Sequence, residues 1–180
     1  MISRTGTGRC VRVLLAAALA VGALGGCRTL LDAADESGCD GTGGRVDALR
    51  SDGVLDSRPP GATVPDGFEK ADAGCWQDSG EAWLYAERTY VFPGDKGDLL
   101  DHYRAVAGPA GWKLSRTDRS AGLCFTPATG EGTSTLNVRF LTAEDLKAQE
   151  PEPGPEFGSG AGYSVALSAT ADGSPTGCSD

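Results

Sequence analysis

The chain has 180 residues, enough for one domain of ordinary size with an appendage and too few for two full domains. Glycine (27) and proline (10) together make up about a fifth of it, which indicates a folded body with long loops. The formal net charge of −9 argues against a nucleic-acid-binding protein, because phosphate contacts require a basic face.

The first 26 residues have the pattern of a secretory signal peptide. Arg4, Arg9 and Arg12 stand in a segment without acids, and the apolar run 13–24 follows. A helix of twelve residues would cover about 18 Å of a ~30 Å hydrocarbon core, so a transmembrane span is the weaker interpretation. A buried helix of a cytosolic protein is disfavoured by the glycine-rich flank and by the later cysteines.

This segment ends in Leu24-Gly25-Gly26-Cys27, which resembles the lipobox of bacterial lipoprotein precursors. The resemblance covers about the first 27 residues. It implies that Cys27 receives a diacylglyceryl group, that cleavage falls between Gly26 and Cys27, and that the chain is anchored at the extracytoplasmic face of the cell membrane. Two acyl chains suffice for stable attachment. Arginine (12) far exceeds lysine (4), which indicates a GC-rich genome, so the source looks actinobacterial.

Four cysteines remain in the mature chain once Cys10 and Cys27 are set aside: Cys39, Cys75, Cys124 and Cys178. An even number in an exported chain predicts two disulfides, with three possible connectivities. A zinc site is disfavoured because structural zinc ligands usually include close CxxC pairs, which these four residues lack. Without its leader the chain would carry a charge of −12, which favours solubility outside the cell.

Residues 27–62 are interpreted as the lipidated cysteine and a flexible tether, with one short helical turn near 46–49. A bridge from Cys39 to the body would pin half of this tether and shorten its reach. The globular domain is expected over residues 63–180.

Within that domain the first elements are a strand and a helix. Residues 75–76 indicate a packed segment or short strand, and residues 81–92 carry apolar groups on both faces, as a central strand does. Pro93-Gly94 breaks that strand. A helix then begins near Asp95 or Asp98 and ends at Gly108-Pro109, with one apolar stripe formed by Leu99, Leu100, Tyr103, Val106 and Ala107.

Alternating patterns predict further strands at 112–116, 123–126, 136–140 and 163–169, with a helical turn at 143–149 and an extended acidic loop at 150–156. This order predicts an α+β domain with one main helix on an antiparallel sheet of about four to six strands. If the last strand pairs with 81–92, Cys75 and Cys178 fall at one end of the sheet, which favours a Cys75–Cys178 bridge. The arrangement loosely resembles small domains of uncharacterised actinobacterial lipoproteins, which implies no activity.

No assembled catalytic site is visible in the sequence. His102 is the one histidine and sits at the edge of the helical stripe, where a surface role is more usual than catalysis. The acidic pairs Asp35-Glu36 and Glu144-Asp145 lie in polar segments, where carboxyl pKa values stay near normal. No cofactor or metal motif is present.

Five large aromatic residues could line a sugar or peptide cleft, although aromatics in a domain of this size more often form its core: Trp76, Trp83, Tyr85, Trp112 and Tyr163. The sequence therefore favours a non-catalytic lipoprotein that binds an unknown envelope protein or ligand. A carboxylate-dependent wall hydrolase and a purely structural envelope spacer are the alternatives. Clustered exposed aromatics would favour binding, and converging carboxylates would favour hydrolysis.

Overall fold

A computed structural model describes residues 38–130, 132–142, 144–145, 148, 154–158 and 160–178. The predicted signal peptide, Cys27 with its cleavage site, the pair Asp35-Glu36 and residues 150–153 of the acidic loop lie outside the described residues, as does most of the predicted turn at 143–149. Among the described residues, no helix is long and apolar enough to cross a membrane.

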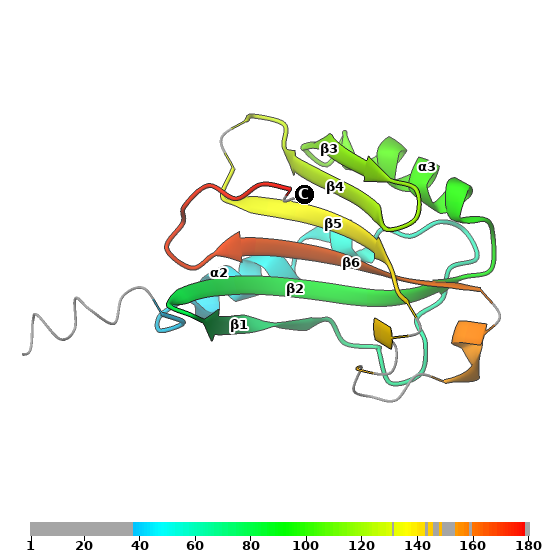
Figure 1. Ribbon diagram of the computed structural model, residues 1–180, viewed down its shortest axis with the longest axis horizontal. Helices are drawn as coiled ribbons and strands as arrows, with labels where there is room; N and C mark the ends of the chain where they lie inside the picture. The colour runs from blue at the N-terminus through cyan, green and yellow to red at the C-terminus, as the bar shows by residue number, and fades with distance from the viewer. Residues whose placement is uncertain are drawn as a thin grey trace, which may run out of the picture. The chain divides into compact units, whose positions relative to one another are not determined.

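Six antiparallel strands form one sheet, in the order β1-β2-β6-β5-β4-β3 (Figure 1). The strands are β1 (Asp72–Asp78), β2 (Glu81–Phe92), β3 (Trp112–Asp118), β4 (Gly122–Pro127), β5 (Ser134–Phe140) and β6 (Ala161–Thr170). The last strand, β6, lies between β2 and β5. It thereby joins the pair β1–β2 to the group formed by β3, β4 and β5. The predicted α+β class and antiparallel sheet are confirmed.

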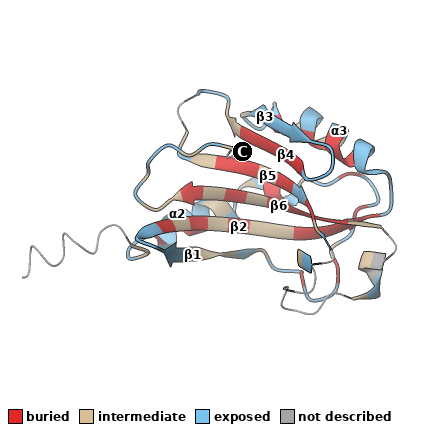
Figure 2. Cartoon of the chain, in the orientation of Figure 1, coloured by how far each residue is buried: buried red, intermediate tan, exposed pale blue. Residues whose placement is uncertain are grey.

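Buried and less buried residues alternate along parts of the central strands β2 and β6 (Figure 2), because successive side chains of a strand point to opposite faces of the sheet. On one face Ala86 lies opposite Leu167 and Tyr90 opposite Tyr163, and all four are buried. This covered face continues on β5 with Leu136 and Val138 and on β4 with Leu123 and Phe125. The opposite face carries mostly polar and small residues and is called the open face below.

Among the described residues, two α-helices pack on the covered face, so the expectation of one main helix is not confirmed. They are α2 (Gly43–Arg50) and α3 (Lys96–Ala107). Val46 of α2 packs against Leu84 and Ala169, and Figure 1 shows α2 behind β2 and β6. Leu99, Leu100, Tyr103 and Ala107 of α3 join the main core, as the predicted apolar stripe requires.

Residues 38–62 are folded onto the sheet, so the expectation of a flexible tether over 27–62 fails for this part. The predicted turn at 46–49 is part of α2, and a 3₁₀ helix, η1 (Gly53–Asp56), buries Val54 and Leu55 in the core. The bridge that would pin the tether is present, because Cys39 is bonded to Cys75.

Two buried tyrosines bind the segment around η1 to the sheet and to α3. The Tyr90 hydroxyl donates to the Leu55 carbonyl at 2.7 Å, and the Tyr103 hydroxyl donates to the Ser57 carbonyl at 2.6 Å. The rings of both tyrosines pack against Tyr163. Each hydrogen bond satisfies a carbonyl in a turn that has few backbone partners of its own, which explains how so polar a segment stays attached.

The two disulfides are Cys39–Cys75 and Cys124–Cys178, so the inferred Cys75–Cys178 bridge is wrong. The predicted antiparallel pairing of the last strand with β2 is present, but it does not bring these two sulfurs together. Cys75 lies opposite Leu84 and faces the covered side, where α2 begins. Cys124 faces the open side, and the C-terminal tail runs across that side to meet it (Figure 1).

We expect non-reducing peptide mapping to recover the Cys39–Cys75 and Cys124–Cys178 links. Replacing either pair by serines should lower the free energy of unfolding by roughly 2–4 kcal/mol, because each bridge closes a long loop of the unfolded chain. Urea denaturation of the two double variants measures that loss. A map that joins Cys75 to Cys178 would contradict the register described above.

Candidate functional site

The open face of the sheet carries a trough whose floor is the central strand β6. Ser164, Ala166 and Ser168 of β6 are small, whereas their neighbours on β2 and β5 have longer side chains. One end of the face is filled, because the ring of Phe157 takes the space above Gly162, where an added Cβ would lie 2.8 Å from the ring. Phe68 packs edge-on against Phe157. The trough begins beyond this apolar plug.

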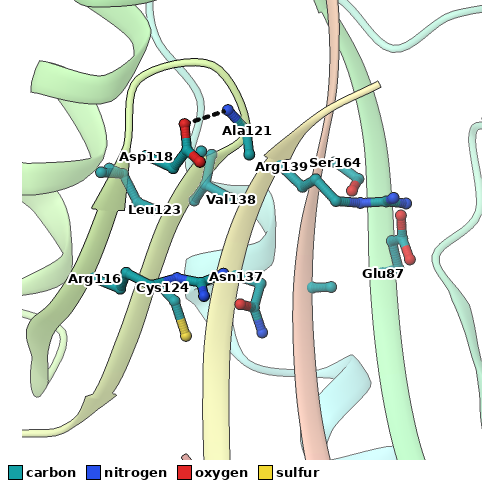
Figure 3. Close-up of a pocket in the computed structure, with 12 residues that line it drawn as sticks. Glu87, Arg116, Asp118, Ala121, Leu123, Cys124, Asn137, Val138, Arg139 and Ser164 are labelled. Atoms are coloured by element: carbon teal, nitrogen blue, oxygen red, sulfur yellow. Dashed lines mark hydrogen bonds between the residues drawn. The ribbon is translucent and has the colours of Figure 1, made fainter. Parts of the chain in front are cut away.

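The first hollow in the trough has a volume of about 270 Å³ and lies over β3, β4, β5 and β6 (Figure 3). Its polar lining includes Arg116, Asn137 and Ser164, together with Glu87 and Arg139. Figure 3 shows the Arg139 side chain reaching across β6 toward Glu87. The register places Glu87, Ala166 and Asn137 in one row, which continues through Cys124 to Arg116.

Two carboxylates near this hollow are held in local hydrogen bonds. Asp118 accepts from the Ser120 amide at 2.8 Å, the Ser120 hydroxyl at 2.6 Å and the Ala121 amide at 3.1 Å. These donors lower the pKa of Asp118, the Ser120 hydroxyl most strongly. A carboxyl group held in its ionised form is poorly suited to act as a general acid.

The second carboxylate, Asp145, orients Arg139. It accepts from the Thr142 amide and hydroxyl, both at 2.7 Å, and forms an ion pair with Arg139 at 3.0 Å. The Thr142 amide and then its hydroxyl are the main causes of the lowered pKa of Asp145, and the charge of Arg139 adds to them. Within the acidic pair Glu144-Asp145 noted in the sequence, Asp145 therefore caps the turn at Thr142 and also holds the guanidinium of Arg139 in place.

The second hollow has a volume of about 440 Å³ and is aromatic. Trp76 lies directly opposite Trp83 on the neighbouring strand, and Tyr85 follows two residues along on the same face. Thr135 and Ser168 continue the row of Tyr85 across the sheet. The tail residues Thr176, Gly177 and Cys178 also line this hollow, where the Cys124–Cys178 bridge holds them.

Gly74 sets the position of Tyr85. It lies opposite Tyr85 on β1, and an added Cβ would lie 3.2 Å from the tyrosine oxygen and 3.4 Å from two ring carbons. The ring therefore lies down over the β1 backbone. A glycine here allows a flat aromatic surface beside the two tryptophans.

The two hollows share Arg116, Cys124 and Asn137 and so form one site, which we call the open-face trough. Its aromatic and polar lining comes from five strands and includes Trp76, Trp83, Tyr85, Glu87, Arg116, Thr135, Asn137, Arg139, Ser164 and Ser168. Of the five aromatics singled out in the sequence, three line the trough. Tyr163 is buried in the core, and Trp112 is partly buried and packs against the core.

The sequence reasoning missed the polar half of the trough. Asn137 and Arg139 alternate with the buried residues of β5, and Ser164, Ala166 and Ser168 do the same on β6. This alternation was the available signal, because it predicts a second sheet face. It does not say which strands are neighbours.

His102 lies away from the trough. Its Nε2 atom is 3.4 Å from the Ser57 hydroxyl, and its ring packs edge-on against Tyr103. Burial lowers its pKa. Asp101, its neighbour in sequence, pairs instead with Arg104 at 2.7 Å. The described residues contain no group of three or more histidines, cysteines, aspartates or glutamates placed to hold a metal ion.

Comparison of the chain with protein-family models, curated proteins and solved structures finds no match.

The hydrogen bonds of Asp145 predict its titration. We expect NMR to give a pKa below the ordinary aspartate value of about 3.9. Thr142→Val should raise this pKa only in part, because the valine keeps the backbone amide that contributes most, and Arg139→Ala should raise it by removing the charge and hydrogen bond of Arg139. The stabilisation from this group is present above the unfolded pKa and is lost as the pH falls through the folded pKa. If Arg139→Ala alone returned the pKa of Asp145 to its ordinary value, the Arg139 guanidinium would be the main partner of Asp145 and would not be available to a ligand in the trough.

Proposed function

We propose that this protein is a membrane-anchored extracytoplasmic lipoprotein whose domain binds an envelope component through the open-face trough, without catalysing a reaction. The observation that carries the binding proposal is the continuity of the trough, which joins three aromatic side chains to hydroxyl, amide and charged groups. Ligand sites typically combine apolar surface with a few convergent polar groups in this way.

The lipobox and the two disulfides support the proposed location. Leu24-Gly25-Gly26-Cys27 supplies the anchor, and disulfides persist in oxidising compartments outside the cytoplasm. Cys39 lies twelve residues after Cys27, a stretch that even fully extended spans no more than about 43 Å. The Cys39–Cys75 bridge would therefore keep strand β1 within that distance of the lipid.

Two alternatives receive less support. A carboxylate-dependent wall hydrolase needs a carboxyl group that stays protonated near neutral pH, and the trough offers Glu87 and a strongly hydrogen-bonded Asp118 whose pKa is lowered. A purely structural spacer needs no hollow lined by exposed aromatic rings. Trp76 has 49% of its surface exposed in this one, which favours a surface that meets a ligand.

The anchor predicts the intact mass of the protein made in a lipid-modifying bacterial host. We expect the mass of residues 27–180 plus a diacylglyceryl group, with four thiols that react only after reduction. Cys27→Ser should abolish the lipid mass and leave the leader uncleaved. An unlipidated full-length chain with free thiols would contradict both the anchor and the compartment.

The trough predicts saturable binding to cell-envelope fragments of the producing bacterium. Trp76→Ala should weaken this binding roughly ten- to thirtyfold, the loss typical of a contact residue near the centre of a site. Leu114→Ala is the matched control, because Leu114 is 40% exposed on edge strand β3 and does not line the trough. Sedimentation of the fragments with the labelled protein measures both. Equal binding by the wild type and Trp76→Ala would count against the trough as the binding surface.

A further inference from the structure

We propose that the open-face trough recognises a neutral oligosaccharide. This inference rests on the proposed binding function and names the chemical class of its ligand. Three features of the trough favour this class of ligand: the aromatic surface at one end, the hydroxyl and amide groups beside it, and the balance of charge at the other end.

The aromatic end offers the flat surface on which a sugar ring stacks. Trp76 and Trp83 form a cross-strand pair, and the ring of Tyr85 packs over Gly74 beside them. The face of an aromatic ring carries partial negative charge, which attracts the weakly positive C–H groups on the face of a pyranose. Trp76 is half exposed, so this surface is accessible in the free protein.

The middle of the trough offers groups that both donate and accept hydrogen bonds. Ser168 lies beside Tyr85, and the buried Thr135 next along this row accepts from the Asn137 amide at 3.2 Å, which orients the Asn137 side chain. Hydroxyl and carboxamide groups have both kinds of capacity, as the hydroxyl groups of a sugar do. Stacking and polar groups therefore lie within one hollow.

The charged end favours a neutral ligand over an ion. Two guanidinium groups, of Arg116 and Arg139, line the first hollow together with two carboxylates, of Glu87 and Asp118. These lining charges balance, and Arg139 is also paired with Asp145, so the hollow has no surplus of positive charge with which to select an anion. The whole chain carries a net charge of −9, which disfavours acidic polymers.

The position of the trough also disfavours a peptide added as an extra strand. Such a peptide binds to the free backbone groups at a sheet edge. The floor strand β6 is paired with β2 on one side and with β5 on the other, so its backbone groups are already used. The five residues from Trp83 to Glu87 span about 13 Å along β2, longer than a single sugar ring. The expected ligand is thus an oligosaccharide recognised by side chains.

The test is calorimetric titration of the protein, purified in detergent from a lipid-modifying bacterial host, with neutral tetrasaccharides. The panel holds maltotetraose, cellotetraose, mannotetraose and N-acetylchitotetraose, together with neutral oligosaccharides released from the envelope of the producing bacterium. We expect saturable millimolar or tighter binding of at least one of them, with a change in tryptophan fluorescence. Tyr85→Ala and Asn137→Ala should each weaken that binding tenfold or more, whereas Tyr85→Phe should retain it within about threefold.

Tyr85→Phe keeps the stacking ring, and Leu114→Ala changes a residue outside the trough. If both controls bind like the wild type, the weaker binding of Tyr85→Ala and Asn137→Ala reflects a lost contact with the ligand and not an unfolded protein. Near-ultraviolet circular dichroism checks the fold of every variant. The inference is overturned if no member of the panel binds the wild type, or if binding survives both Tyr85→Ala and Asn137→Ala. Envelope binding that depends on Trp76 but is destroyed by protease would retain the proposed function and assign a protein partner instead. Loss of all envelope binding would remove the proposed function itself.

Discussion

The pairing of β2 with β6 determines both faces of this protein. The two strands are some seventy residues apart in the sequence and pair over ten consecutive positions. One register places Tyr90 against Tyr163 in the core and Tyr85 beside Ser168 on the open face. Because side chains alternate along a strand, a shift of one residue would exchange the two sets. The hydrophobic core therefore fixes the positions of the strand residues that line the trough.

The two disulfides fasten the ends of the described chain to opposite faces of that sheet. Cys39 is joined to β1 on the covered side, and Cys178 is joined to β4 on the open side. Such bridges reduce the entropy of the unfolded chain. They matter here because the N-terminal segment buries few large side chains, chiefly Val46, Val54 and Leu55. Covalent attachment and two tyrosine hydrogen bonds together hold a segment whose composition resembles a linker.

The sequence predicts the elements of the fold well and their partners poorly. The strand at 81–92 and the helix after Pro93-Gly94 follow from local patterns, and both are present with those bounds or close to them. The folding of 38–62 could not be seen, because two short apolar clusters among glycines and aspartates look the same in a tether. Three of the five aromatics singled out in the sequence line the trough, but their pattern alone favoured a place in the core. The polar half of the trough required knowledge of which strand lies beside β6, which depends on contacts between distant segments.

The position of the C-terminal tail links the compartment to the site. Thr176, Gly177 and Cys178 form part of the wall of the aromatic hollow. Among the described residues, this tail is fastened by the Cys124–Cys178 bond and by a 3.4 Å hydrogen bond from the Thr176 amide to the Gly132 carbonyl. A single backbone hydrogen bond contributes about 1 kcal/mol, too little to order a tail that loses conformational entropy at every residue. The wall therefore depends on the disulfide, and the aromatic hollow is complete in the oxidised protein, as the proposed extracytoplasmic location would require.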